Sequence, residues 1–152
     1  TDKEAQMSVV EIDGFVPVSD RTSIGAYRQK IVDRLLSGML SARLSDLSQK
    51  PDSPFLMAFA GRGPFIDRAK DSVSLAAMVK DDGLSQGLDA LLVEAGRAAR
   101  FGFTAAELDR QKQTVLRSYE RMFTERDNRD SGAVAGDARR VTVWQLEAEA
   151  QE

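Results

Sequence analysis

The 152-residue sequence contains no cysteine and no histidine. Without cysteine there is no disulfide, no thiolate metal ligand and no thiol nucleophile, and the redox state of the compartment is not constrained. Without histidine the chain lacks the usual general base, the usual partner of a serine nucleophile and the commonest metal ligand. A zinc site would depend on carboxylates alone, which is unusual for zinc. We therefore predict no catalytic residue, no metal ligand and no cofactor in this chain.

The sequence also lacks a long apolar run and an excess of charge of one sign. No hydrophobic segment approaches the ~20 residues of a membrane-spanning helix. The 21 basic and 24 acidic residues are well mixed and give a net charge of −3. We therefore expect no membrane span and no nucleic-acid partner. With 42% hydrophobic and 30% charged residues, the chain can build the core of one ordinary globular domain.

Both ends of the sequence resemble cuts within something larger. The chain starts at Thr1 rather than methionine, and no signal-like segment follows. Residues 147–152 favour a helix and contain no stop signal. We expect residues 1–152 to be a single domain of a longer, multi-domain polypeptide.

Apolar clusters predict three strands, and helical periodicity predicts four helices. The expected strands are residues 7–18, 55–60 and 72–79; the expected helices are residues 23–49, 84–101, 104–125 and a last helix from near Ser131. The second and third strands are close in sequence, so we expect them to pair antiparallel. The order β-α-β-β-α-α-α predicts an α+β fold, in which long helices pack on one face of an antiparallel sheet.

Apolar stripes predict how two of these helices pack. The helix that begins after its cap at Ser23 has a stripe broad enough to lie flat across a sheet. The helix at residues 84–101 places five apolar residues on one face: Leu84, Leu88, Leu91, Leu92 and Ala95. Gly102 stands where this helix should stop.

The strongest local signal is the start of the next helix. Thr104 and Glu107 have the spacing of a capping box, and Phe103 and Leu108 have that of a hydrophobic staple. Arg43 lies in an apolar stretch of the long helix, so we expect it to pair with an acid or to cap carbonyl groups rather than to serve an active site.

Two short motifs allow a functional or a plain interpretation. Gly61-Arg62-Gly63 resembles a phosphate loop but lacks the Walker spacing and a following helix start, so a break or bulge at residues 61–64 is the better interpretation. Asp81-Asp82 could hold a cation or form a carboxylate pair. Because Gly83 follows, a turn that also favours the next helix N-terminus is the simpler interpretation.

Two features near the C-terminus concern interaction surfaces. The alternating charges of residues 117–130 are typical of a solvated helix face with ion pairs, although a partner-binding surface is the alternative. Trp144, on a helix with Val141, is either a core residue or a residue that docks on a neighbouring domain.

Several segments together resemble one family. They are Tyr27-Arg28, the run Met-Leu-Ser-Ala-Arg-Leu at residues 39–44, Pro54-Phe55, Tyr119-Glu120 and residues 102–112, which are similar to a "GFT..EL.R.K" segment. Over about residues 6–139 the sequence resembles the pitrilysin/insulinase-type zinc peptidases, which include bacterial proteins and the mitochondrial processing peptidases. Arg43 and Gly102 match recurring positions of that family, and we interpret both as structural.

The resemblance implies an architecture of homologous α+β domains in tandem, with the metallohydrolase fold of the processing peptidases. The first domain carries an HxxEH motif, whose histidines bind zinc and whose glutamate activates water; a downstream glutamate is the third ligand. The second domain lacks the motif and helps to wall a chamber around peptide substrates. Because this chain has no histidine, the resemblance implies the non-catalytic second domain, with zinc in the catalytic domain of the intact protein.

The expected function is therefore a structural, substrate-enclosing domain of a zinc metalloprotease that is inactive by itself. An assembly subunit related to processing-peptidase core proteins is the alternative, and an unrelated helical adaptor would lack a sheet. The expected partners are the catalytic domain of the same polypeptide and peptides or unfolded proteins, with self-association of the isolated chain. The resemblance favours a periplasmic location over a cytoplasmic one.

Overall fold

The computed structural model describes residues 7–18, 23–65, 70–80 and 82–125. Its elements are β1 (Ser8–Pro17), α1 (Ile24–Ser48), β2 (Met57–Pro64), β3 (Lys70–Val79), α2 (Leu84–Phe101) and α3 (Ala105–Thr124). The chain forms two compact units, Thr1–Gln113 and Thr114–Glu152, and the boundary between them along the chain falls within α3. The expected helix from Ser131, with Val141 and Trp144, lies outside the described residues. No helix in the described ranges is long and apolar enough to cross a membrane.

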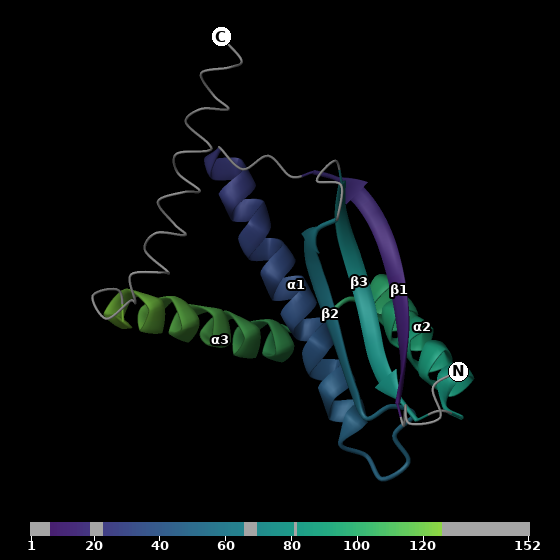
Figure 1. The fold of residues 1–152 in the computed structure, drawn as a ribbon. Helices are drawn as coiled ribbons and strands as arrows, with labels where there is room; N and C mark the ends of the chain where they lie inside the picture. The colour runs from purple at the N-terminus through teal and green to yellow at the C-terminus, as the bar shows by residue number, and fades with distance from the viewer. Residues whose placement is uncertain (1–6, 19–22, 66–69, 81, 126–152) are drawn as a thin grey trace. The chain divides into compact units, whose positions relative to one another are not determined.

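The sheet has three antiparallel strands in the order β1-β3-β2, so β3 is central and the other two are edges (Figure 1). This confirms the predicted α+β class and the antiparallel pairing of the second and third strands. The predicted break at residues 61–64 is wrong, because β2 stays in register with β3 from Gly61↔Ser74 to Pro64↔Asp71. The two glycines tolerate extended backbone, and Arg62 between them is held by ion pairs to a helix and to β3.

One face of the sheet carries the core. Directly paired residues of antiparallel strands share a face, so Val10, Ala77 and Ala58 point to the same side. Helix α1 contacts β2, α2 contacts β3 and β1, and the two helices contact each other, so both cover this inner face. The buried cluster consists of Leu44, Phe55, Ala58, Ala77, Val79 and Leu91. Each fully buried Leu or Val side chain contributes roughly 1.5–3 kcal/mol by leaving water.

Helix α2 has the predicted bounds but is rotated about its axis relative to the predicted stripe. Its buried residues are Gly87, Leu91 and Glu94, at spacings of four and three. Leu84, Leu88 and Leu92 are exposed, at 47%, 38% and 51%. The reason is close approach, because a Cβ at Gly87 would lie 2.5 Å from Cγ1 of Val79. The helix therefore presents its smallest residue to β3.

Helix α1 begins at the predicted cap, where the Ser23 side chain accepts a hydrogen bond from the Ala26 amide at 3.1 Å. Its buried residues, Met39 and Leu44, lie in its C-terminal half. Ile24 is 91% exposed and Tyr27 is 56% exposed. The broad apolar stripe predicted a helix that lies flat across the sheet. Among the described residues, the first turn of α1 is exposed and only its later turns are buried.

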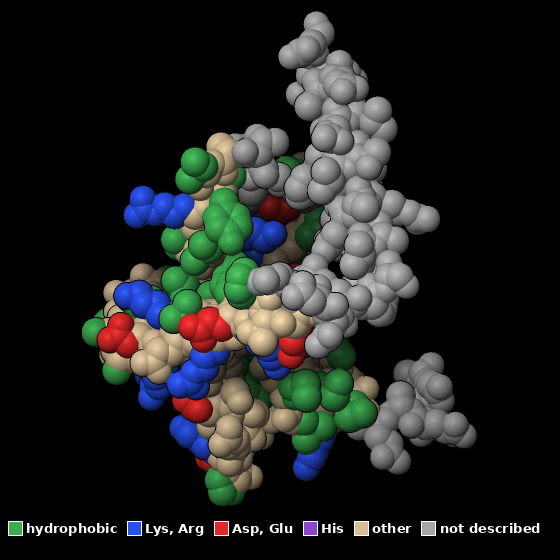
Figure 2. Space-filling view, turned by 90° about the vertical axis from the view of Figure 1, so that its left-hand side faces the viewer, with side chains coloured by type: hydrophobic (Ala, Val, Ile, Leu, Met, Phe, Trp, Pro, Cys, Tyr) green, Lys and Arg blue, Asp and Glu red, His purple; other side chains and the backbone are tan. Residues whose placement is uncertain are grey.

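Charged side chains of both signs are interspersed with hydrophobic ones over the face drawn in Figure 2.

Candidate functional site

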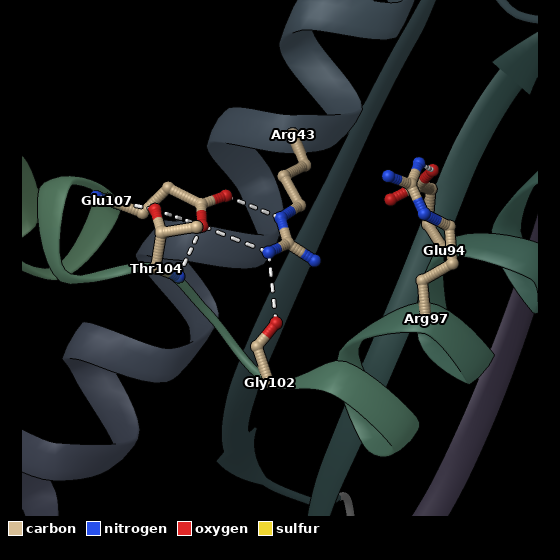
Figure 3. Close-up of polar contacts among 6 residues, drawn as sticks. All are labelled: Arg43, Glu94, Arg97, Gly102, Thr104 and Glu107. Atoms are coloured by element: carbon tan, nitrogen blue, oxygen red, sulfur yellow. Dashed lines mark hydrogen bonds and ion pairs between the residues drawn. The ribbon is translucent and has the colours of Figure 1, made fainter.

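Arg43 of α1 joins the end of α2 to the beginning of α3 (Figure 3). Its Nε lies 2.5 Å from Oε1 of Glu107 and its Nη2 lies 3.0 Å from Oε2, which is a bidentate pair. Nη2 also donates to the Gly102 carbonyl at 2.9 Å. The guanidinium carbon lies 4.4 Å from the centre of the Phe103 ring. The prediction that Arg43 pairs with an acid or caps carbonyls is confirmed in both parts.

Glu107 also takes part in the N-terminal cap of α3. Its Oε2 accepts a hydrogen bond from the Thr104 amide at 2.7 Å, and the Glu107 amide donates to Oγ1 of Thr104 at 3.3 Å. These two bonds are the reciprocal pair of a capping box, as predicted. Just before it, Gly102 has φ of 64°, a left-handed conformation that favours glycine, and ends α2 at the predicted place.

The electrostatics of this junction fix its protonation states. The hydrogen bond from Arg43, followed by that from the Thr104 amide, lowers the pKa of Glu107 from 4.5 to about 2. The bond to Glu107 raises the pKa of Arg43, and the nearby charge of Glu94 adds to this. Near neutral pH both groups stay ionised, so neither is suited to proton transfer. The junction is a structural clamp.

Arg62 holds a second ion-paired cluster, on the inner face of the sheet. Its Nη1 lies 2.8 Å from Oδ2 of Asp33 on α1, and its Nη2 lies 3.6 Å from Oδ2 of Asp71 on β3. Asp71 is buried, at 7% exposed. Because two carboxylates already surround this guanidinium, the Gly61-Arg62-Gly63 segment does not fit a phosphate.

The segment around Asp82 forms a turn. The Gly83 amide donates to the Lys80 carbonyl at 2.8 Å, which confirms the predicted turn; Asp81 lies outside the described residues. Beside the turn is an open hollow of about 300 Å³, lined by Asp52, Ser53, Pro54, Phe55, Leu56, Lys80, Asp82, Gly83 and Gln86. A smaller hollow of about 40 Å³ lies beside the Arg43 clamp and is lined partly by Arg110 and Gln111. The hydroxyl in the larger lining, that of Ser53, donates to the Phe55 carbonyl at 2.6 Å rather than to a base.

Carboxylates do not gather into a metal site in the part of the chain that the structure describes. No group of three or more acidic side chains there is placed to hold a metal ion. With no histidine and no cysteine in the sequence, the donor set does not fit zinc.

Sequence reasoning missed Glu94, whose side chain is 4% exposed on the sheet-facing stripe of α2. Its Oε1 accepts a hydrogen bond from Nη1 of Arg97 at 2.6 Å, and its buried Oε2 has no hydrogen-bond partner among the described residues. Helical spacing could have predicted this burial. Glu94 follows Leu91 by three residues and Gly87 by seven, so the three residues share one face of α2. Burying this carboxylate costs stability that the Arg97 pair only partly offsets.

The outer face of the sheet was missed as well. Its exposed hydrophobic side chains are Val9 at 63%, Phe15 at 51%, Met57 at 58% and Phe59 at 53%. Phe15 makes an edge-to-face contact with Phe65 at 4.6 Å between ring centres. Consecutive apolar residues on β1, Val9 and Val10, were the available signal, since a strand that is apolar on both faces is typically covered on both.

No protein-family model matches the chain, and no curated protein is similar to it in sequence. Among solved structures, it is similar to the crystal structure of the periplasmic protease PqqL from Escherichia coli, with a TM-score of 0.80 and 19% identity. The chain shares a peptidase fold. The match covers 93% of this chain and 16% of that one. The crystal structure of the first half of PqqL gives a TM-score of 0.72 and 20% identity, over 85% of this chain and 28% of that one.

The chain thus spans less than a third of either PqqL structure. At this identity the likeness shows the fold, which is the α+β class expected from the sequence.

Proposed function

We propose that this chain is a non-catalytic domain of a zinc peptidase, which helps to enclose peptide or unfolded-protein substrates beside a catalytic domain of the same polypeptide. The observation that carries the proposal is the 0.80 TM-score to a protease over 93% of the chain, in a sequence without histidine or cysteine. A peptidase fold is present, and the residues that would bind a catalytic zinc are not.

The Arg43 clamp supports a framework role. It fixes the end of α2 and the start of α3 with two groups that keep their charges at neutral pH. A wall of a substrate chamber must keep its shape without taking part in the chemistry. PqqL is described as periplasmic, which supports a periplasmic location for this chain too.

Three proteins test the proposal: the isolated chain, the polypeptide that contains it, and that polypeptide with residues 1–152 deleted. We expect the isolated chain to bind no stoichiometric zinc and to cleave no peptide. The containing polypeptide should bind zinc and hydrolyse unfolded protein, and the deletion variant should keep its zinc while losing this hydrolysis. Metal analysis and a fluorogenic-peptide assay provide the measurements. Stoichiometric, submicromolar zinc binding by the isolated chain would overturn the assignment.

The exposed outer face of the sheet favours a second candidate, an assembly domain of a relative that has lost catalysis. The sequence upstream distinguishes the two. An intact HxxEH motif with bound zinc supports the peptidase, whereas a containing polypeptide that lacks both supports the assembly role.

A further inference from the structure

The two edges of the sheet are not equivalent, because α1 covers part of the β2 edge. The Ala60 amide donates to Oγ of Ser41 at 2.9 Å, and the same hydroxyl donates back to the Ala60 carbonyl at 3.1 Å. Both backbone polar groups of Ala60 are therefore taken by a helix side chain. Another strand cannot pair with β2 at this point without displacing Ser41.

The β1 edge offers a much longer pairing surface. All ten residues of β1 are in unbroken register with β3, from Ser8↔Val79 to Pro17↔Lys70. Among the described residues no strand lies on the other side of β1. Roughly half of the backbone groups of an edge strand point away from its neighbour, and these are the groups that a further strand would use.

Hydrophobic side chains of β1 are exposed to solvent beside this edge. Val9 and Phe15 are both more than half exposed on the outer face, and across the sheet Met57 and Phe59 add to the same apolar surface. Large apolar side chains that are exposed together on one sheet face are candidates for an interaction site. A further strand beside β1 would shield Val9 and Phe15 while its backbone completes the ladder.

Charge indicates the chemistry of that strand. Glu11 and Asp13 lie between Val9 and Phe15 on the outer face, both exposed, and neither forms an ion pair with a described residue. Opposite charges directly across a strand pair are stabilising, and like charges are destabilising. A strand with Lys or Arg at two alternate positions therefore fits β1 best.

The same charges disfavour a second copy of this chain. Two antiparallel registers use nearly the whole of β1 and keep the outer faces on one side, one centred on Ile12 and the other on Asp13. The first places Glu11 opposite the Asp13 of the other copy, and the second places Asp13 opposite itself. Both juxtapose carboxylates directly.

The geometry also disfavours a free peptide. A peptide at this edge would find no side-chain pocket in either hollow described above, because neither is lined by a β1 residue. It would bear the full cost of association. A strand on the same polypeptide has an effective concentration on the order of millimolar and avoids most of that cost. The fold occurs in a protease of which this chain covers only 16%.

We propose that the free edge of β1 is closed by an extended strand from the rest of the polypeptide that contains this domain, with Lys or Arg side chains opposite Glu11 and Asp13. The inference rests on the part of the proposed function that makes the chain a domain of a larger protein. It does not depend on whether that protein is an active peptidase.

Amide hydrogen exchange in the isolated chain and in the containing polypeptide tests the pairing. Edge-facing amides of β1 should exchange about a hundredfold more slowly in the containing polypeptide, because a further strand takes their hydrogen bonds. The Ala60 amide, already bonded to Ser41, is the internal control and should be protected in both. Equal exchange of β1 in the two proteins would overturn the proposal. So would protection in the isolated chain that rises with its concentration, because this would identify a second copy.

Charge reversal tests the chemistry of the partner strand. The double variant Glu11→Lys with Asp13→Lys should lower the melting temperature of the containing polypeptide and leave that of the isolated chain within error of wild type. Asp89→Lys, at an exposed position of α2, is the matched control and should change neither. An unchanged melting temperature of the double variant in the containing polypeptide would refute a basic partner strand. Peptidase activity and zinc content, measured on the same samples, report separately on the proposed function.

Discussion

The Arg43–Glu107 clamp gives the most quantitative prediction of the structure. Glu107→Gln keeps the shape of the side chain and an oxygen that can accept the Thr104 amide, so it removes the charge while leaving the capping box possible. What it loses is the charge-assisted, bidentate bond from Arg43.

The magnitude follows from the pKa of Glu107, which falls from 4.5 to about 2 on folding. Such a shift corresponds at most to ~3 kcal/mol. The Arg43 and Glu107 side chains are 19% and 18% exposed, so solvent screening reduces the contribution to roughly 1–2 kcal/mol. We expect Glu107→Gln to lower the free energy of unfolding by that amount at pH 7.

The pH dependence of stability separates the effect of the Glu107 charge from other effects of the substitution. Because the folded-state pKa is depressed, the stabilisation is present in full above the unfolded-state value of 4.5 and is lost as the pH falls towards 2. Urea unfolding of wild type and Glu107→Gln across this range should therefore give curves that converge at low pH. Glu120→Gln, at an exposed position of α3, is the control and should follow wild type throughout. Equal stability at pH 7, or a difference that persists at pH 2, would refute the reasoning.

Three further predictions concern the helix cap, the sheet contact of α2 and association. Thr104→Ala should destabilise the chain by ~1 kcal/mol, the typical value of a lost N-cap, and an unchanged denaturation midpoint would contradict the observed capping box. Gly87→Ala should cost roughly 1–3 kcal/mol because its methyl group would overlap Val79, whereas Gly96→Ala, with open space around the position, should be neutral or stabilising. The isolated chain should self-associate more readily than the containing polypeptide through its apolar outer face, without pairing of β1 edges; sedimentation that shows a strict monomer at high concentration would argue against this.

The sequence by itself determined the elements whose causes are local. The Thr104–Glu107 spacing predicted the start of α3, and Gly102 predicted the end of α2, because capping bonds and backbone conformation depend on residues a few positions apart. Three strands and three of the four expected helices were found in this way. The absence of histidine and cysteine also limited the possible chemistry before any coordinate was considered.

Only the tertiary structure decided which surfaces meet. Arg43 finds its carboxylate 64 residues away, and β2 continues through Gly61 and Gly63 because β3 offers a matching ladder. Close approach at Gly87 turns Glu94 into the core and leaves a leucine stripe outside, against the prediction from periodicity. Periodicity identifies an apolar face, but the height and angle at which two surfaces pack decide which face is buried, and these are properties of residues far apart in the chain.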